Sequence, residues 1–213
     1  MRLNFIKTIL FSFSIVLFLA SCQKEISIDL GSQNGGGGGT GNNNNIIGDW
    51  DYVGMTATTN SSVTVPSPAG ELKAVTVSGY TTKNNTGTVN ITATEFIFTG
   101  MGYTIDTMSN VKTYLNGLLI GDQDVPFTMT SPPTNNTSPY TRINNDSLTV
   151  SGSFGINNPS GLTPPGPHGI KIGWSGDTLL LRMVTSFTQS ITQGGTSGTL
   201  DATLNGIIKL KRR

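Results

Sequence analysis

The segment TLDATLNGIIKLK, residues 199–211, decides the fold class because it alternates apolar and polar residues. Side chains of a β-strand point to opposite faces with a period of two. One face would therefore carry Leu200, Ala202, Leu204, Gly206, Ile208 and Leu210. The opposite face would carry Asp201, Thr203, Asn205, Lys209 and Lys211. The pattern predicts a half-buried strand at the end of the chain.

Similar segments recur upstream of this strand, separated by turn residues. The alternation predicts strands at 49–58, 72–82, 87–99, 101–107, 112–120 and 125–130. No segment has a convincing amphipathic helical pattern, although KTYLNGLL at 112–119 could form one short helical turn. Many short strands of this kind are typical of a β-sandwich or a β-barrel.

Turn chemistry refines this assignment. Ser175-Gly176-Asp177 separates two apolar segments, which predicts a hairpin, and Asn144-Asn145-Asp146 precedes the strand-like segment SLTVSGSF. The apolar phase changes between Ala93 and Phe96, which predicts a bulge or a tight turn near Thr94-Glu95. The proline-rich segments 131–139 and 157–169 are predicted to be loops, because proline cannot donate to a strand ladder.

The first residues read as a secretory signal. Arg2 and Lys7 precede an apolar run at 9–20, which is short for a transmembrane helix. The following Leu19-Ala20-Ser21-Cys22 resembles the lipobox of bacterial lipoproteins. The resemblance implies cleavage after Ser21, diacylglycerol on the sulfur of Cys22, and usually an N-acyl chain such as palmitate. The alternative is an ordinary exported thiol.

The lipoprotein resemblance implies attachment to the outer membrane. Lys24-Glu25 is similar to a short form of the surface-export signal of Bacteroidota lipoproteins. Display on the cell surface and a position on the periplasmic face both remain open. Cys22 is the only cysteine, so the folded part of the chain must be stable without an internal disulfide.

Composition divides the chain into three parts. Residues 1–21 form the signal peptide, 22–45 the lipidated N-terminus and linker, and 46–213 one folded domain. The segment 31–45, GSQNGGGGGTGNNNN, offers few side chains to bury and is predicted to be a flexible spacer. Charged residues make up only 12% of the sequence, and the 13 basic residues nearly balance the 12 acidic ones. This balance argues against nucleic-acid binding, which requires a basic surface.

The domain opens with IIGDWDYVGMTATT, residues 46–59. Gly48-Asp49-Trp50 resembles the Gly-X-Trp start of lipocalin-like barrels, and the whole chain resembles bacterial lipoproteins that carry such a domain. The resemblance implies an all-β antiparallel barrel of about eight to ten strands over 46–213. It also implies that Gly48 allows a sharp entry into the first strand and that Trp50 closes one end. Arg182 and Arg212 are the candidates for the arginine that stacks on this tryptophan.

Catalytic chemistry is poorly represented. His168 is the only histidine, and no G-x-S-x-G motif accompanies it. The pairs Asp49/Asp51 and Asp122/Asp124 have a spacing of about 6–7 Å along a strand, which could suit glycoside hydrolysis. Solvated strand ends and turns explain these carboxylates more simply. We therefore expect no catalytic residues, no metal site and no cofactor.

Three Asp-Ser/Thr pairs, each followed by an apolar residue, resemble the O-glycosylation sequence of Bacteroidota. They would place glycans on Thr107, Ser147 and Thr178. The alternative is turn chemistry, because an aspartate side chain at a turn bonds to its own backbone.

The sequence thus predicts a lipid-anchored, non-enzymatic β-barrel lipoprotein that binds a small apolar or amphipathic ligand. The membrane, through the anchor, and this ligand are its expected partners, and no oligomeric state is indicated. The alternative is a structural or interaction lipoprotein with a filled core, either adhesin-like or glycan-binding. A glycan-binding face would expose aromatic side chains from the set Tyr103, Tyr114, Tyr140 and Trp174.

Acylation of Cys22 can be tested by metabolic labelling. In cells given a tagged fatty acid, the wild-type chain should become labelled and lose residues 1–21. Cys22→Ser should remain unlabelled and keep its signal, because the sulfur that accepts the lipid is gone. Mass spectrometry of the native product that revealed a free thiol at Cys22 would contradict the anchor.

Overall fold

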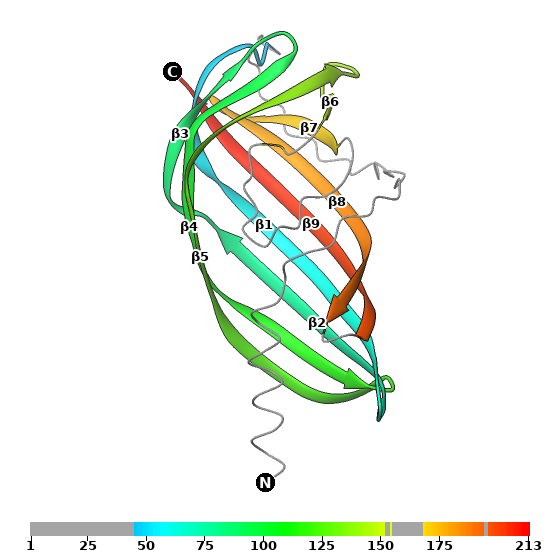
Figure 1. Ribbon diagram of the computed structural model, residues 1–213. Coiled ribbons are helices and arrows are strands. Elements are labelled where there is room, and N and C mark those ends of the chain that lie inside the picture. The colour runs from blue at the N-terminus through cyan, green and yellow to red at the C-terminus, as the bar shows by residue number, and fades with distance from the viewer. Residues whose placement is uncertain (1–44, 152–153, 155–167, 194–195) are drawn as a thin grey trace.

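The computed structural model describes residues 45–151, 154, 168–193 and 196–213 (Figure 1). The predicted signal peptide, Ser21, Cys22, the linker up to residue 44 and most of the segment 157–169 lie outside these residues. The described part is an all-β fold whose strands form one antiparallel sheet. This agrees with the all-β class that the sequence predicts.

Nine strands make up the sheet. Their bounds are β1 Gly48–Ser67, β2 Gly70–Thr81, β3 Lys83–Ile91, β4 Glu95–Leu115, β5 Leu118–Arg142, β6 Ser147–Val150, β7 His168–Ser175, β8 Thr178–Gln193 and β9 Thr196–Arg212. From β3 to β9 each strand pairs with the next in sequence. β1 then pairs with β9, from Trp50 with Arg212 to Thr64 with Thr199, and the sheet closes into a ring.

Between β1 and β4 the ring contains two strands, β3 in its upper part and β2 in its lower part. Residues Gly48–Asp51 of β1 pair with β3, and Thr56–Ser67 pair with β2. β4 likewise pairs with β3 near its start and with β2 near its end. In Figure 1, β3, β6 and β7 mark the upper half of the ring, and β2 with the far ends of β1, β4, β5, β8 and β9 forms the lower half.

The change of partner along β1 is held by side chains. Thr82, which follows β2, accepts a hydrogen bond from the Met55 amide at 2.8 Å through its Oγ1, and its own amide donates to the Met55 carbonyl at 2.9 Å. The Asn85 side chain donates to the Val53 carbonyl at 2.9 Å. The β1–β9 register shifts between Tyr52 and Gly54 at the same level, as expected of a β-bulge.

The upper half is filled by apolar side chains. Alternate residues of the strands point inward, and those of the upper half are almost fully buried. The ring of Phe96 lies 4.9 Å from that of Tyr140 and 5.0 Å from that of Phe154. Side chains of this core that are at most 1% exposed include Trp50, Val89, Ile91, Phe96, Phe98, Leu148, Ile170, Leu179, Leu181, Ile208 and Leu210.

Trp50 occupies the upper end of this core with its side chain fully buried. Its indole N–H donates to the Ile46 carbonyl at 2.9 Å, and the guanidinium carbon of Arg212 lies 5.3 Å from its ring centroid. Arg212 is itself exposed, and a cation–π contact at an exposed site contributes about 0.5–1 kcal/mol. The expectation that an arginine stacks on the tryptophan is confirmed for Arg212.

Gly48 starts β1 with a φ of 137°, in the region that favours glycine. A Cβ at this position would also approach the Arg212 guanidinium to 3.4 Å. A side chain at this position would therefore strain the backbone and crowd the Arg212 guanidinium.

The prediction of a loop at 131–139 is wrong, because this segment belongs to β5. Proline is tolerated in a strand whose amide faces an unpaired edge or a bulge. From Leu118 to Pro139, β5 pairs with β4 alone among the described residues. The β4–β5 register also shifts between Met101 and Tyr103, opposite Pro132 and Pro133. Of the second predicted loop, His168 and Gly169 lie in β7.

Two predicted strand boundaries are also corrected. The segment 87–99 is two strands, because Thr92 caps a turn whose Glu95 amide donates to its Oγ1 at 3.0 Å. The predicted turn therefore exists, slightly before Thr94-Glu95. Segments 101–107 and 112–120 are not separate, since β4 is continuous to Leu115.

The segment 112–119 is a hairpin rather than a helical turn. Leu115 pairs with Leu118 across Asn116 and Gly117, whose φ angles are 51° and 80°. Positive φ at both central residues is the geometry of the two-residue hairpin turn that Asn-Gly favours.

The hairpin and turn predictions at 175–177 and 144–146 are confirmed. Ser175 pairs with Thr178 across Gly176-Asp177, and β6 begins directly after Asp146. Among the described residues of the segment SLTVSGSF, however, only Ser147–Val150 form a strand, and 125–130 is an inner part of β5. Along β9, Leu200, Gly206, Ile208 and Leu210 are buried, whereas Asp201 and the other polar alternates face outward.

Candidate functional site

The lower half of the ring differs from the upper half in how well its interior is covered. Its inward-facing apolar side chains stay partly exposed, and Phe127 is 38% exposed. On the β8–β9 wall, by contrast, Phe187 and Leu200 are buried. The partly exposed set includes Val63, Val65, Leu72, Val111, Val125 and Phe127. Their exposure means that protein atoms do not fill this part of the interior completely.

The inward direction of these residues follows from the register. Val63 pairs with the buried Leu200, and Phe127 lies two residues from Met129, which pairs with the buried Ile105. Residues that alternate with them, such as Thr128, are exposed on the outside. The partly exposed apolar residues therefore line one continuous inner surface.

Among the described residues, no strand pairing closes the wall of the lower half between β5 and β8. β6 pairs with β5 only at Tyr140–Arg142, and β7 pairs with β8 only at Thr178–Met183. Below these points, within the described ranges, β5 pairs only with β4 and β8 only with β9. The short β6 and β7 thus span the ring at its upper end alone (Figure 1).

Three tyrosines lie where the filled half meets the lower half, and we call them the tyrosine layer: Tyr52 of β1, Tyr80 of β2 and Tyr103 of β4. Tyr52 and Tyr103 are buried, and Tyr80 packs against the core while remaining partly exposed. The Tyr52 hydroxyl lies 3.4 Å from the Thr82 hydroxyl. The layer places phenol hydroxyls inside the ring on three different strands.

Further polar groups are buried beside the tyrosine layer. The hydroxyls of Ser78 and Ser109 share a hydrogen bond of 2.6 Å across β2 and β4. Ser131 pairs with Tyr103 across β4 and β5 and is 3% exposed. Its Oγ makes no hydrogen bond, which is unusual for a buried hydroxyl.

Burial makes the layer resist ionisation. Desolvation raises the pKa of Tyr52 from 10.0 to about 12, against a smaller opposing effect of its contact with Thr82. Desolvation also raises the pKa of Tyr103, to which Tyr52 and Tyr80 add electrostatically, while the nearby Ser131 hydroxyl opposes the increase without reaching hydrogen-bond geometry. Burial likewise raises the pKa of Tyr80. All three phenols are therefore neutral hydrogen-bonding groups at physiological pH.

The described inward-facing positions of the lower half carry no charged side chain. The acidic and basic residues of these strands point outward, where Lys112 and Asp122 form an ion pair of 3.7 Å. The inner surface is therefore apolar with hydroxyl and amide groups, and it can hold a neutral molecule without burying an unpaired charge.

The acidic pairs considered from the sequence lie on the outside. Asp49 accepts a hydrogen bond from Asn90 at 2.7 Å, and Asp51 pairs with Arg213 at 2.7 Å. Asp122 and Asp124 both accept from the Asn110 side chain, at 2.9 and 3.0 Å. Structural interactions thus occupy all four carboxylates.

His168 is buried at the start of β7, where it pairs with Val150 of β6. The described residues contain no group of three or more histidine, cysteine or acidic side chains able to hold a metal ion.

The predicted glycosylation residues occupy different environments. Thr178 starts β8 at the Gly176-Asp177 turn, and its hydroxyl lies 3.4 Å from the Asp177 carboxylate. Ser147 is 7% exposed and donates to Asp146 at 2.7 Å. Thr107 shares the inward side of β4 with Ser109 and donates to the Gly79 carbonyl at 2.8 Å. Ser147 and Thr178 both follow a turn, but only Thr178 is also partly exposed, which leaves room for a glycan.

The aromatic residues considered for a glycan-binding face do not form one. Tyr103 and Tyr140 are buried, whereas Trp174 is 37% exposed and its ring lies 5.8 Å from that of Trp50. Tyr114 faces outward on β4. The sequence alone indicates no function for Tyr52 and Tyr80, because only the strand register shows that they lie close to Tyr103.

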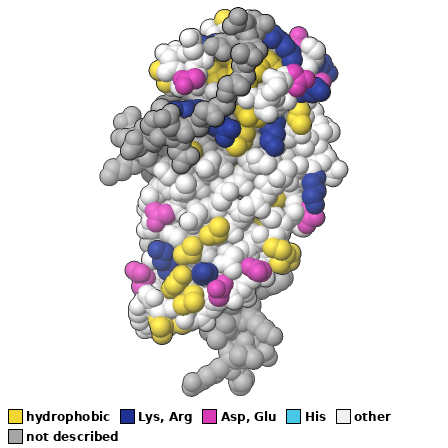
Figure 2. All heavy atoms as spheres, turned by 180° about the vertical axis from the view of Figure 1, so that it is seen from behind, with side chains coloured by type: hydrophobic (Ala, Val, Ile, Leu, Met, Phe, Trp, Pro, Cys, Tyr) yellow, Lys and Arg dark blue, Asp and Glu magenta, His cyan; other side chains and the backbone are white. Residues whose placement is uncertain are grey.

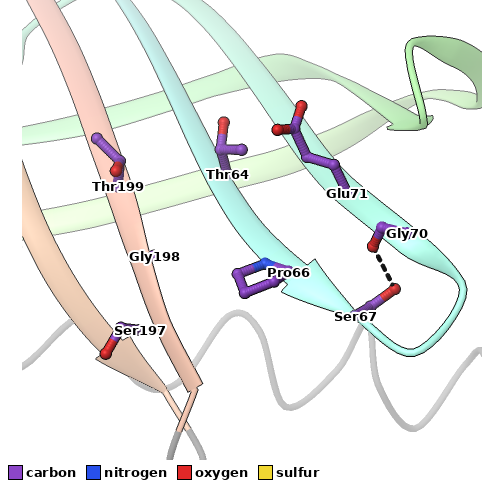
Figure 3. Close-up of a pocket in the computed structure, with 8 residues that line it drawn as sticks. All are labelled: Thr64, Pro66, Ser67, Gly70, Glu71, Ser197, Gly198 and Thr199. Carbon is purple, nitrogen blue, oxygen red and sulfur yellow. Dashed lines mark hydrogen bonds between the residues drawn. The ribbon is translucent and has the colours of Figure 1, made fainter.

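A shallow hollow of about 460 Å³ lies at the lower end of the ring, lined by residues of β1, β2 and β9 (Figure 3). Thr64 and Thr199 line it, and they alternate with the inward-facing Val63 and Leu200. The hollow is therefore on the outer surface and separate from the interior. The Ser67 hydroxyl donates to the Gly70 carbonyl at 2.7 Å and closes the β1–β2 turn beside it.

Comparisons with models of protein families, with curated proteins and with solved structures found no match to this chain. Within the described ranges, no helix is long and apolar enough to span a membrane. The chemistry of the site must therefore be read from the residues themselves.

The raised pKa of Tyr52 predicts a loss of stability at high pH. The unfolded chain releases this proton near pH 10.0, whereas the folded chain holds it to about pH 12. The folded state binds more protons in this window, so the free energy of unfolding should be constant below pH 10 and decrease from there to pH 12. From about 1.4 kcal/mol per pKa unit, the decrease due to Tyr52 is about 2–3 kcal/mol.

Urea denaturation at a series of pH values measures this decrease. Tyr52→Phe should remove a large part of it, and Tyr114→Phe, on the outside of β4, should retain it. An unchanged slope in Tyr52→Phe would show that the phenol is not buried as described.

Proposed function

We propose that this chain is an exported, non-enzymatic lipoprotein, held at the outer membrane by acylated Cys22, that binds a small apolar or amphipathic ligand inside the lower half of its ring. One observation carries the ligand proposal: the inward-facing apolar side chains of the lower half are partly exposed, whereas those of the upper half are buried. Small closed sheets either fill their interior with side chains or hold one small ligand.

The energetic argument follows from the exposed area. Removing apolar surface from water contributes about 25 cal/mol per Å². A ligand that covers Phe127, Val125 and Val111 would bury surface that the chain itself leaves in water. In this proposal the ligand would enter between β5 and β8, where no strand pairing among the described residues closes the ring.

A lipocalin-like barrel is the finer form of this proposal. Its support is the upper end, where Gly48 starts the first strand with a positive φ and Arg212 stacks on the buried Trp50. In this proposal Trp50 seals the upper end, so the ligand lies below the tyrosine layer.

The anchor and linker fit this function. Each buried CH₂ of an acyl chain contributes about 0.8 kcal/mol, so two or three chains on Cys22 would hold the protein at the membrane. The glycine- and asparagine-rich segment 31–45 would separate its ends by about 20 Å as a flexible coil. The domain could then reorient while it remains tethered.

A structural or interaction role is the second candidate, supported by exposed apolar side chains at the β4–β5 turn. Leu118 is 70%, Leu119 47% and Ile120 55% exposed. Figure 2 shows hydrophobic side chains among charged ones at the lower end of the molecule. An exposed apolar group of this kind can contact a protein partner.

Native mass spectrometry of the protein purified from its own host tests the ligand proposal. The wild-type chain should carry an additional non-covalent mass. Phe127→Lys should lose that mass, because it places a charge on the inner surface. Thr128→Lys, the next residue on β5 but facing outward, should retain it. A wild-type chain that never carries more than its covalent mass would favour the interaction role instead.

A further inference from the structure

We infer that the ligand carries an uncharged hydrogen-bonding group, and that the tyrosine layer with Ser131 binds this group while the apolar part of the ligand extends into the lower half. This inference rests on the proposed function and specifies the class of molecule that it would bind. Monoacylglycerols, fatty alcohols and fatty amides have this chemistry, whereas fatty acids and alkyl amines do not.

The position of the layer supports this arrangement. Tyr80 pairs with the buried Ala57, directly above inward-facing residues of β1 that are only partly covered. Tyr103 lies two residues from Ile105 of the core and pairs with Ser131. A ligand that fills the lower half would therefore approach the layer beside Tyr80, because the buried Ile105 lies between Tyr103 and the lower half on β4.

Two hydroxyl groups at the tyrosine layer, those of Ser131 and Tyr80, have no side-chain hydrogen-bond partner among the described residues. The Ser131 hydroxyl is buried, and its Oγ makes no hydrogen bond. Tyr80 packs against the core but stays partly exposed, and its hydroxyl makes no side-chain hydrogen bond to the described residues. A buried hydroxyl without a partner is unfavourable, so a ligand that supplies an acceptor or a donor there gains affinity.

Charge selects the class of ligand. The inward-facing positions described in the lower half hold no acidic or basic side chain, and Arg212 lies at the opposite end beside Trp50. A carboxylate or ammonium group at the tyrosine layer would lose its hydration without gaining a counter-ion. A hydroxyl, ester or amide group loses much less and can pair with the phenols.

The apolar surface below the layer completes an amphipathic site. Val111, Val125 and Phe127 continue the inner surface of β4 and β5 toward the lower end. On these two strands the apolar surface lies below Tyr103 and Ser131, and the pair Ile105–Met129 lies between them. A molecule with one polar end and one hydrocarbon end matches this order.

Isothermal titration of the full-length chain, held in an amphipathic polymer, tests the inference with three probes of equal chain length: 1-monolauroylglycerol, dodecanoate and dodecyltrimethylammonium. Titration into the polymer alone gives the blank. Monolauroylglycerol should bind with one-to-one stoichiometry and at least about tenfold more tightly than either charged probe. Tyr80→Phe combined with Ser131→Ala should weaken it by about tenfold or more, as expected for the loss of one or two hydrogen bonds.

The outcomes separate this inference from the function on which it rests. Tyr114→Phe, which removes a hydroxyl from the outside of β4, should leave the affinity unchanged. Tighter binding of a charged probe, or an unchanged affinity in the Tyr80/Ser131 variant, would overturn the inference and leave the proposed function standing. Absence of binding by all three probes would overturn both. The selectivity of the wild-type chain decides the matter even if the variant folds poorly.

Discussion

The pairing of β1 with β9 is the constraint on which the structure depends. It joins the first strand of the domain to the last, from Trp50 with Arg212 to Thr64 with Thr199. Without it both strands would be long exposed edges, and exposed edges promote pairing with other chains. The contact also joins residues far apart in sequence, so its loop-closure entropy must be offset by many ladder bonds and by core packing. Trp50 and Arg212 strengthen this closure at its upper end.

Closure explains why the two halves of the ring differ. The upper half brings β3, β6 and β7 into the wall and carries large side chains such as Phe96, Phe98 and Leu181, which fill the interior. In the lower half no strand pairing among the described residues joins β5 to β8, and the inward residues of β1, β2, β4 and β5 there are mostly valine, threonine and serine. Smaller side chains around an incomplete wall leave apolar surface exposed. The same difference places the tyrosine layer at a boundary between packed and accessible interior.

Much of the fold was predictable from local patterns. The alternation along residues 199–211 and the Gly176-Asp177 turn need only neighbouring residues to be read correctly. The Asn116-Gly117 hairpin was predictable in principle, since this pair favours positive φ, but the leucines around it also fit a helical turn. The loop prediction for the proline-rich part of β5 is wrong because a proline disrupts a strand only where its nitrogen would face a partner strand. Which positions face a partner is determined by the whole sheet and cannot be seen in the local sequence.

The candidate site was less predictable than the fold. Tyr52, Tyr80 and Tyr103 lie on three strands, and only the long-range register brings them together. Nothing in the sequence near Phe127 indicates that it faces inward on a strand with an unpaired edge. The resemblance carried by Gly48-Asp49-Trp50 implies a stacking arginine and leaves Arg182 and Arg212 as candidates, and only the structure identifies Arg212 as the one over Trp50.

Thiol reactivity at single introduced cysteines measures the central claim most directly, in a chain whose Cys22 is replaced by serine. A cysteine at the inward-facing Val125 should react with a small polar reagent almost as fast as one at the outward-facing Thr128. A cysteine at Leu181, in the packed upper half, should be protected strongly. Equal protection at 125 and 181 would mean that the lower interior is filled, and it would contradict the account.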